Sequence, residues 1–228
     1  MSFRFGFLVF PNVQQLDLTG PYEMFASATG AQMHLVWKDL APVRSATGLM
    51  LTPTHTLADC PQLDVICIPG GAGVNALLLD EDVLQFVREQ AAGARYVTSV
   101  CTGALVLGAA GLLKWKRATT HWNAVDYLAR FGATHVEARI VKDGNLITAG
   151  GVTAGIDFGL AVVAELMGQH EAERVQLSLE YDPHPPFSSG TPRQASPQLL
   201  ALARERIAPS IAAREAIVAE WEKRTATV

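Results

Sequence analysis

The chain has 228 residues, of which 49% are hydrophobic, 18% charged and 7% aromatic, as expected for one large globular domain with a sizeable core. Its formal net charge is −4 at pH 7, so electrostatics gives no reason to expect nucleic acid or an anionic membrane as a partner. No apolar run in the sequence approaches the roughly 20 residues that a membrane-spanning helix needs.

Strand-like and helix-like segments alternate along the first half of the chain. The apolar run 3–10 ends at Pro11, as a buried strand does, and it lacks the small-residue cleavage site of a signal peptide. A short helix is expected to open at Pro21, in its first turn. The other elements expected here are a strand at 33–38, a hairpin over 43–57 with its turn at Thr47-Gly48, a strand at 64–68 and a helix at 80–92 that ends at Gly93.

The second half continues the same pattern. A strand at 96–100 runs directly into Cys101 and a helix at 104–113. The elements expected after it are a strand at 117–121, a helix at 123–131, a hairpin over 135–149 with its turn at Asp143-Gly144, and a buried helix at 153–166. This alternation predicts the α/β class, a mostly parallel sheet with helices on both faces. Loops at the carboxyl ends of the strands build the active site in such folds, which selects Asp17, Gly70-Gly71 and Cys101.

The C-terminal part differs in composition. Residues 182–197 are rich in Pro, Ser and Gly and indicate an irregular segment on the surface. One or two amphipathic helices broken near Pro209 are expected beyond it, too short for an appended helix-turn-helix DNA-binding domain. We therefore expect a catalytic α/β domain over residues 1–190 and a helical tail over 191–228, packed on the same domain or on a dimer partner.

Cys101 stands between an expected strand and an expected helix, in the string Ser99-Val100-Cys101-Thr102-Gly103. Small residues two positions to either side allow the sharp turn of a nucleophile elbow, which projects the side chain out of the sheet. The sulfur then lies at a helix N-terminus, where free N–H groups and the helix dipole favour a thiolate. A free cysteine is more often an inert core residue, but this context favours a catalytic nucleophile.

Three cysteines, an odd number, make neither a disulfide framework nor a metal spacing, and reduced thiols are typical of the cytoplasm. No His/Cys/Asp/Glu cluster indicates a metal, and no glycine-rich phosphate-binding fingerprint indicates a nucleotide cofactor. Cys67, inside an apolar strand, and Cys60, in a loop, are interpreted as structural.

A thiol nucleophile needs a proton partner. Asp17 follows the first strand in an expected loop, although a carboxylate there is also a common turn former or helix cap. His121, at the end of a later strand, is a second candidate, with a purely structural role equally open. The backbone N–H groups of Gly70-Gly71 could orient an oxyanion or a lone pair opposite the sulfur.

Four strings resemble the PfpI/ThiJ superfamily: 65–71, 99–104, 118–122 and 150–157. The resemblance spans roughly residues 3–187 and implies a flavodoxin-like fold related to class I glutamine amidotransferases. Within the superfamily, the strings 14–21, 176–181 and 185–187 resemble the isocyanide hydratases. The chain lacks the His-x-Glu of the amidotransferases, and Thr102 stands where peptidase-type members carry a histidine.

The resemblance implies cofactor-free hydration of an isocyanide, R–N≡C, to an N-formamide by a homodimer. Cys101 is then the nucleophile that forms a covalent thioimidate, and Asp17 is the general acid, with a pKa raised by burial. Groups near Gly71 and Thr102 would orient the substrate nitrogen or the attacking water. Two further residues complete the expected substrate site: Val152, at the Gly-rich entry to a buried helix, and His121.

Two other functions stay open at this point. A glyoxalase- or deglycase-like enzyme would use the same thiolate against a reactive carbonyl, although such members usually carry Glu in the first-strand region, where this chain offers Asp17. A redox sensor of the same fold would use Cys101 as an oxidisable thiol without turnover.

Overall fold

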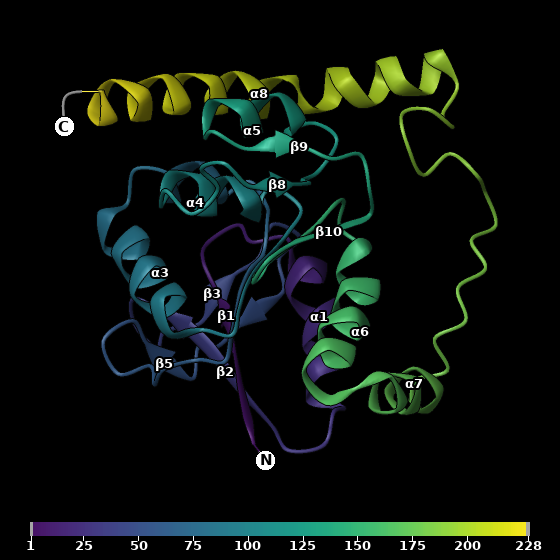
Figure 1. Ribbon diagram of the computed structural model, residues 1–228. Coiled ribbons are helices and arrows are strands. Elements are labelled where there is room, and N and C mark those ends of the chain that lie inside the picture. The colour runs from purple at the N-terminus through teal and green to yellow at the C-terminus, as the bar shows by residue number, and fades with distance from the viewer. Residues whose placement is uncertain (1, 227–228) are drawn as a thin grey trace.

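The computed structural model describes residues 2–226, and its centre is a seven-stranded sheet (Figure 1). The strand order is β10-β11-β7-β6-β1-β2-β5, and every neighbouring pair is parallel except β10 and β11. The strands are β1 (Phe3–Leu8), β2 (Ala31–Trp37), β5 (His55–Thr56), β6 (Val65–Ile68), β7 (Tyr96–Val100), β10 (Ile140–Asp143) and β11 (Leu146–Ala149). The mostly parallel α/β sheet predicted from the sequence is confirmed.

Helices cover both faces of the sheet because its central strands are apolar on both sides. In Figure 1, α1 and α6 lie on one side of the sheet and α3 and α4 on the other. In β1, Phe5 and Phe7 belong to the core on the side of α1 and α6, while Leu8 belongs to the core on the side of α3 and α4. The helices are α1 (Gln15–Ala26), α2 (Val74–Leu77), α3 (Glu81–Gly93), α4 (Gly103–Ala109), α5 (Val125–Arg130), α6 (Ala154–Met167), α7 (Gln169–Ser178) and α8 (Pro197–Thr225).

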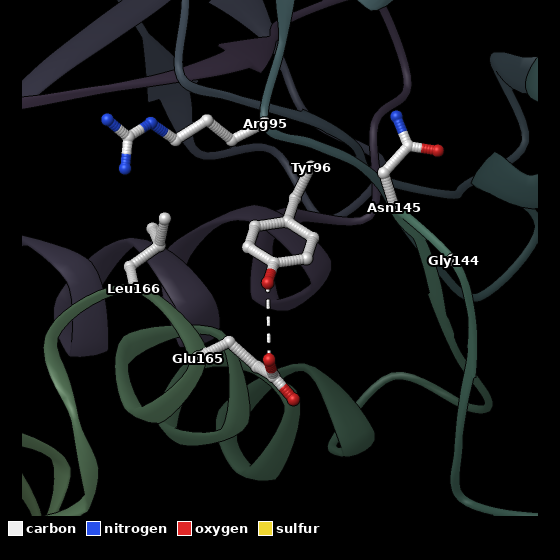
Figure 2. Close-up of a pocket in the computed structure, with 6 residues that line it drawn as sticks. All are labelled: Arg95, Tyr96, Gly144, Asn145, Glu165 and Leu166. Atoms are coloured by element: carbon white, nitrogen blue, oxygen red, sulfur yellow. Dashed lines mark hydrogen bonds between the residues drawn. The ribbon is translucent and has the colours of Figure 1, made fainter.

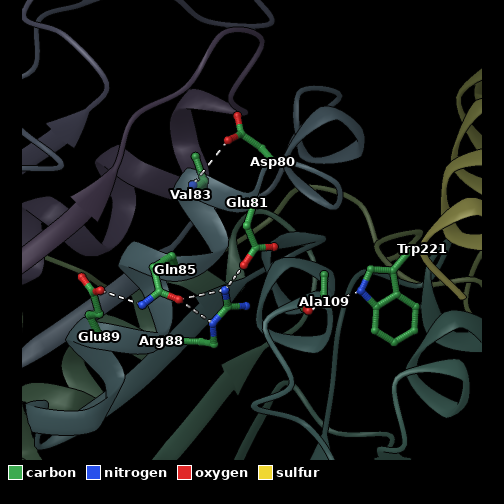
Figure 3. A network of polar contacts seen from close by, with 8 residues as sticks. All are labelled: Asp80, Glu81, Val83, Gln85, Arg88, Glu89, Ala109 and Trp221. Atoms are coloured by element: carbon green, nitrogen blue, oxygen red, sulfur yellow. Dashed lines mark hydrogen bonds and ion pairs between the residues drawn. The ribbon is translucent and has the colours of Figure 1, made fainter. Parts of the chain in front are cut away.

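Both predicted hairpins form around the predicted turns, but each is shorter than predicted. The hairpin expected over 43–57 ends at Leu51, because residues 55–56 form β5 in the main sheet, and the one expected over 135–149 begins at Ile140, because His135 pairs with Ala118. β3 (Val43–Arg44) pairs with β4 (Met50–Leu51) around the Thr47-Gly48 turn, and β10 pairs with β11 around Asp143-Gly144. The predicted helix that ends at Gly93 is α3, which begins at the Asp80 cap (Figure 3). Residues 182–196 contain neither helix nor strand, as their composition predicted.

The first helix is longer than predicted, because α1 begins at Gln15 and not near Pro21. A proline in a helix interior removes one backbone hydrogen bond. Packing against α6 offsets that loss: a Cβ on Gly155 of α6 would lie only 3.0 Å from the Pro21 ring. Asp17, predicted to lie in a loop, therefore lies in the first turn of α1.

The strand predicted over 117–121 is mostly wrong. Only Arg117–Ala118 is extended, as β8, and it pairs with β9 (Thr134–His135) outside the main sheet. The side chain of Thr148 takes the next backbone N–H, that of Thr119, at 2.9 Å. The N–H of Thr119 is thus bonded to a side chain and not to a strand carbonyl, and the next residue, Thr120, bonds to the carbonyl of Cys101 after β7.

The C-terminal segment is one helix, α8, whereas a break near Pro209 was predicted. A proline inside a helix costs about 3 kcal/mol. The second half of α8 offsets this cost by packing across α4 and α5 (Figure 1). Val218 is fully buried there, and Trp221 Nε1 donates to the Ala109 carbonyl at 3.3 Å (Figure 3). Within residues 2–226, no helix has the length and apolar character to cross a membrane.

Candidate active site

Three loops follow the carboxyl ends of three adjacent strands, β1, β6 and β7. The chain leaves β1 for β2 on one side and then returns to β6 on the other side. The crevice between β1 and β6 is therefore a topological switch point, the place where α/β sheets bind ligands. Asp17, Gly70 and Cys101 follow the three strands in that order, and hydrogen bonds join their loops.

Cys101 has the strained backbone of a nucleophile elbow. Its φ of 58° lies in the left-handed region, which residues other than glycine rarely adopt. The N–H of Cys101 donates to the carbonyls of Ala149 at 3.1 Å and Gly150 at 2.8 Å. The Thr120 hydroxyl donates to the Cys101 carbonyl at 2.8 Å. These bonds hold the strained turn in place.

Thr120 was not singled out from the sequence. The available signal was its position beside His121, within the string 118–122 that resembles the PfpI/ThiJ superfamily. The expected strand there hid its role, because a strand residue would bond to a neighbouring strand and not to the elbow.

Asp17 is completely buried beside the cysteine. Its Oδ2 accepts a hydrogen bond from the Gly70 N–H at 2.9 Å, while its Oδ1 has no hydrogen-bond partner among residues 2–226. Burial raises the pKa of Asp17 to about 7, against the smaller opposite effects of the Gly70 N–H and the Cys101 thiol. The carboxyl group therefore holds a proton over a large part of the neutral range.

Cys101 does not rest as a thiolate, contrary to the prediction from its place before a helix. Burial and then the neighbouring Asp17 carboxylate raise its pKa well above the usual value. The N–H and the hydroxyl of Thr102 act in the opposite direction, as donors at a helix start do, but their effect is smaller. The two acidic groups thus compete for protons in one buried site.

Gly71 and Thr102 lie next to each other, because the Gly71 N–H donates to the Thr102 hydroxyl oxygen at 3.1 Å. The prediction that Gly71 offers an unobstructed N–H is therefore wrong for this state of the protein. A substrate that used this N–H would have to displace Thr102. The N–H and hydroxyl of Thr102 instead lie close enough to the Cys101 sulfur to lower its pKa.

His121 lies beside the elbow loop, next to Gly151, but it makes no hydrogen bond to Cys101. Burial lowers its pKa, so the ring is neutral at pH 7. Its Nδ1 accepts the Asn123 N–H at 3.3 Å, which assigns the ring proton to Nε2. His121 can therefore donate one hydrogen bond from Nε2, and no hydrogen bond joins it to the thiol in this structure.

Val152 is half-buried at the start of α6 and packs on the core that contains Cys101. The contact between its loop and the cysteine is made by the backbone, since the Gly150 carbonyl accepts the Cys101 N–H. Val152 therefore lines the region beside the elbow without a polar role.

Two surface hollows of about 310 Å³ each lie elsewhere. Figure 2 shows the first, which is lined by Arg95, Tyr96, Gly144, Asn145, Glu165 and Leu166. Tyr96 begins β7, whereas Cys101 follows its end, so roughly 16 Å of strand separates them. The Tyr96 hydroxyl donates to the Glu165 carboxylate at 3.2 Å, so these two reactive groups of the hollow are engaged with each other. We therefore place the candidate chemistry at the Cys101 loops.

No group of three or more His, Cys, Asp or Glu side chains in the described part of the chain could hold a metal ion. The candidate site thus consists of a thiol, a carboxylic acid, a neutral imidazole and a few backbone donors. This set can carry out nucleophilic and acid–base chemistry.

Comparison with known proteins decides the family. The model of the DJ-1/PfpI family matches residues 4–165. The chain belongs to the DJ-1/PfpI family. Its sheet has the flavodoxin-like arrangement expected from the resemblance.

Two curated relatives differ in how much of their sequence they share with this chain. The isonitrile hydratase of Pseudomonas putida is 61% identical over 217 residues, which is 95% of each chain. The Parkinson disease protein 7 homolog of Danio rerio is 32% identical over 143 residues, 60% of this chain and 76% of that protein.

Solved structures agree on the fold. A ThiJ/PfpI family protein from Pseudomonas syringae superposes with a TM-score of 0.92 at 45% identity, covering 96% of this chain and 91% of the other. Drosophila melanogaster DJ-1beta gives a TM-score of 0.73 at 24% identity, covering 79% of this chain and 98% of the other, and indicates the fold alone.

Proposed function

We propose that this protein hydrates isocyanides to N-formamides, with Cys101 as the nucleophile and Asp17 as the general acid. The similarity to an isonitrile hydratase over 95% of both chains supports the reaction class. The observation that carries the residue assignment is the buried Asp17 carboxyl group beside the Cys101 thiol. The Oδ1 atom of Asp17 has no hydrogen-bond partner among the described residues.

The first half of the reaction forms a carbon–sulfur bond. Where Asp17 is ionised, its carboxylate takes the Cys101 proton, and the thiolate attacks the terminal carbon of R–N≡C, which is electrophilic toward a soft nucleophile. Asp17 returns the proton to that carbon, so the product is the thioimidate R–N=CH–S–Cys101. A carboxyl group with a pKa near 7 suits this exchange, because it can hold and release a proton at neutral pH.

The second half adds water. The hydroxyl of a water molecule bonds to the thioimidate carbon, and its proton passes to the nitrogen. The carbon–sulfur bond then breaks, the hydroxyl proton goes to the Asp17 carboxylate, and R–NH–CHO leaves. The net change is R–N≡C plus H2O giving R–NH–CHO, and return of the Asp17 proton to the Cys101 sulfur restores the thiol and the carboxylate.

The other residues of the proposed site assist the reaction without gaining or losing a proton. The Thr102 N–H and hydroxyl favour the thiolate as it forms. The His121 Nε2–H is available to orient the water or the substrate nitrogen, because its Nδ1 is already engaged by Asn123. Val152 and Gly71 border the same space, and no cofactor is needed.

The test is formamide production from a para-substituted aryl isocyanide, followed by absorbance. Cys101→Ala is expected to abolish turnover, and Asp17→Asn to lower kcat at least about a hundredfold, because it cannot deliver a proton to carbon. Cys60→Ala is the matched control, since Cys60 is a half-buried thiol on a loop outside the site.

Intact turnover in Cys101→Ala would show that the nucleophile assignment is wrong. An unchanged rate in Asp17→Asn would remove the proton-donor role. Consumption of methylglyoxal without isocyanide turnover would favour the reactive-carbonyl enzyme, and turnover of neither would favour the redox sensor.

A further inference from the structure

Arg214 of α8 is the one buried arginine or lysine in the described part of the chain, with 3% of its surface exposed. It has no aspartate or glutamate within ion-pair distance among residues 2–226, unlike Arg130, which pairs with Glu215 and Glu222. Burying a cation without a partner is costly, so its position needs an explanation.

The guanidinium joins two loops of the domain. Its Nε donates to Asn75 Oδ1 at 3.3 Å, and its Nη1 donates to the Asn123 carbonyl at 3.3 Å. Its Cζ lies 5.6 Å from the centre of the Tyr127 ring. A second, longer bond runs from the same Nη1 to Asn123 Oδ1 at 3.5 Å.

Both loops touch the elbow. Asn75 lies in the short helix that follows Gly71, and the Gly71 N–H is bonded to Thr102. Asn123 donates to His121 in a segment whose Thr120 is bonded to the Cys101 carbonyl. Arg214 is therefore linked to the Cys101 elbow by two short series of contacts. One runs through Asn75 to the Gly71–Thr102 bond, and the other runs through Asn123 to the segment of His121 and Thr120.

Charge explains why a cation lies there. With one proton between them, the Asp17–Cys101 pair carries a buried negative charge in either arrangement of that proton. Burial lowers the pKa of Arg214, and the thiolate of Cys101 is among the groups that oppose this shift. The effects that set the pKa of Cys101 most strongly are those of burial, Asp17 and Thr102.

We propose that Arg214 is a positioning residue of the Cys101 site, whose guanidinium holds the Gly71 and His121 loops and balances the negative charge of the Asp17–Cys101 pair. The inference rests on the proposed role of Cys101 as the nucleophile. It assigns to α8, which lies beyond the matched residues 4–165, a part in the reactivity of the thiol.

The test measures the rate at which iodoacetamide alkylates Cys101 in the full chain, from about pH 6 to pH 10, by mass spectrometry of the peptide that contains it. A Cys60→Ser background removes the other accessible thiol, since Cys67 is fully buried. Arg214→Gln removes the charge, and Arg214→Lys keeps it. Arg206→Gln is the matched control, because Arg206 is an exposed cation on the same helix.

Arg214→Gln is expected to slow alkylation at pH 7.5 about threefold to tenfold and to raise the apparent pKa of the thiol, because removing one unit charge that interacts with the thiolate costs on the order of 1 kcal/mol. Arg214→Lys should stay within about twofold of wild type, as should Arg206→Gln. In isocyanide turnover, Arg214→Gln should lower kcat more than it raises KM.

Superimposable pH profiles for Arg214→Gln and wild type would overturn the proposal. A fall in Arg214→Lys as large as in Arg214→Gln would overturn the charge role. If Arg214→Gln does not fold, Arg214→Lys is compared with wild type instead, and a fall of more than about threefold would overturn the charge role. Alkylation needs no isocyanide, so a failure of the proposed hydration would be seen separately.

Discussion

At the scale of single residues, the site is a thiol and a carboxyl group that share a small buried volume. Burial raises the pKa of both groups, the Asp17 carboxylate raises the pKa of Cys101 further, and the Cys101 thiol lowers the pKa of Asp17 by a smaller amount. The pair therefore keeps a proton at neutral pH that a solvent-exposed aspartate would have lost. This retained proton is what the proposed chemistry needs, because the isocyanide carbon must be protonated.

The raised pKa of Asp17 makes folding stability depend on pH. An unfolded aspartate loses its proton near pH 3.8 and the folded one near pH 7. Between these values only the folded state holds the proton, so its stability falls as the pH rises; outside them, both states have the same protonation.

Asp17→Asn removes this slope. From about pH 5 to pH 8, the wild type should lose about 2–3 kcal/mol of unfolding free energy relative to the variant. Urea unfolding at the two pH values measures the difference. Parallel curves for the two proteins would show that Asp17 is ionised throughout.

Gly70 is required by the atoms of the site itself. A Cβ at this position would lie 2.6 Å from the Thr102 nitrogen and 2.8 Å from Asp17 Oδ2. Gly70→Ala should therefore displace Asp17 and lower turnover about a hundredfold.

Gly190→Ala is the control for this change, because nothing lies within 4 Å of the Cβ it adds. Isocyanide turnover and thermal unfolding of both variants check the prediction. Turnover of Gly70→Ala within about threefold of wild type would contradict the geometry described.

At the scale of elements, α8 is a long helix with two unlike halves. Its first half exposes Leu199 and Leu202, while its second half buries Arg214 and Val218. Anchoring by the second half explains why Pro209 lies within a continuous helix. The amphipathic pattern predicted a helix on each side of the proline, but only the contacts with α4 and α5 favour one.

Trp221→Ala tests this anchor. Loss of its contact with Phe131, at 4.6 Å between ring centres, and of its bond to Ala109 should lower the free energy of unfolding by about 2–3 kcal/mol. Leu202→Ala is the control, with an expected change within about 0.5 kcal/mol, because this side chain is 57% exposed. Urea unfolding distinguishes the two, and equal midpoints would contradict the anchoring role.

At the scale of the whole molecule, the homodimer implied by the resemblance stays a prediction. A dimer of this chain has a mass of about 49 kDa, twice 24.5 kDa. Sedimentation equilibrium or light scattering measures this mass directly. A value near 24.5 kDa at micromolar concentration would show a monomer.

The sequence by itself determined the sheet, the elbow and the three loops, because these depend on local patterns. Apolar residues marked β1 and β6, the run Tyr96–Val100 marked β7, and small residues around Cys101 marked the tight turn. Asp17, Gly70-Gly71 and Cys101 followed from the rule that parallel strands present their carboxyl ends at one edge.

Only the tertiary structure decided the chemistry within that edge. The thiol was expected to ionise, but burial and Asp17 hold its proton, and no local pattern reports burial by distant segments. The N–H of Gly71 is taken by Thr102, and Thr120 supports the elbow from a segment that resembled a strand. Arg214 lies 113 positions beyond Cys101, where only the packing of α8 brings its charge to the site.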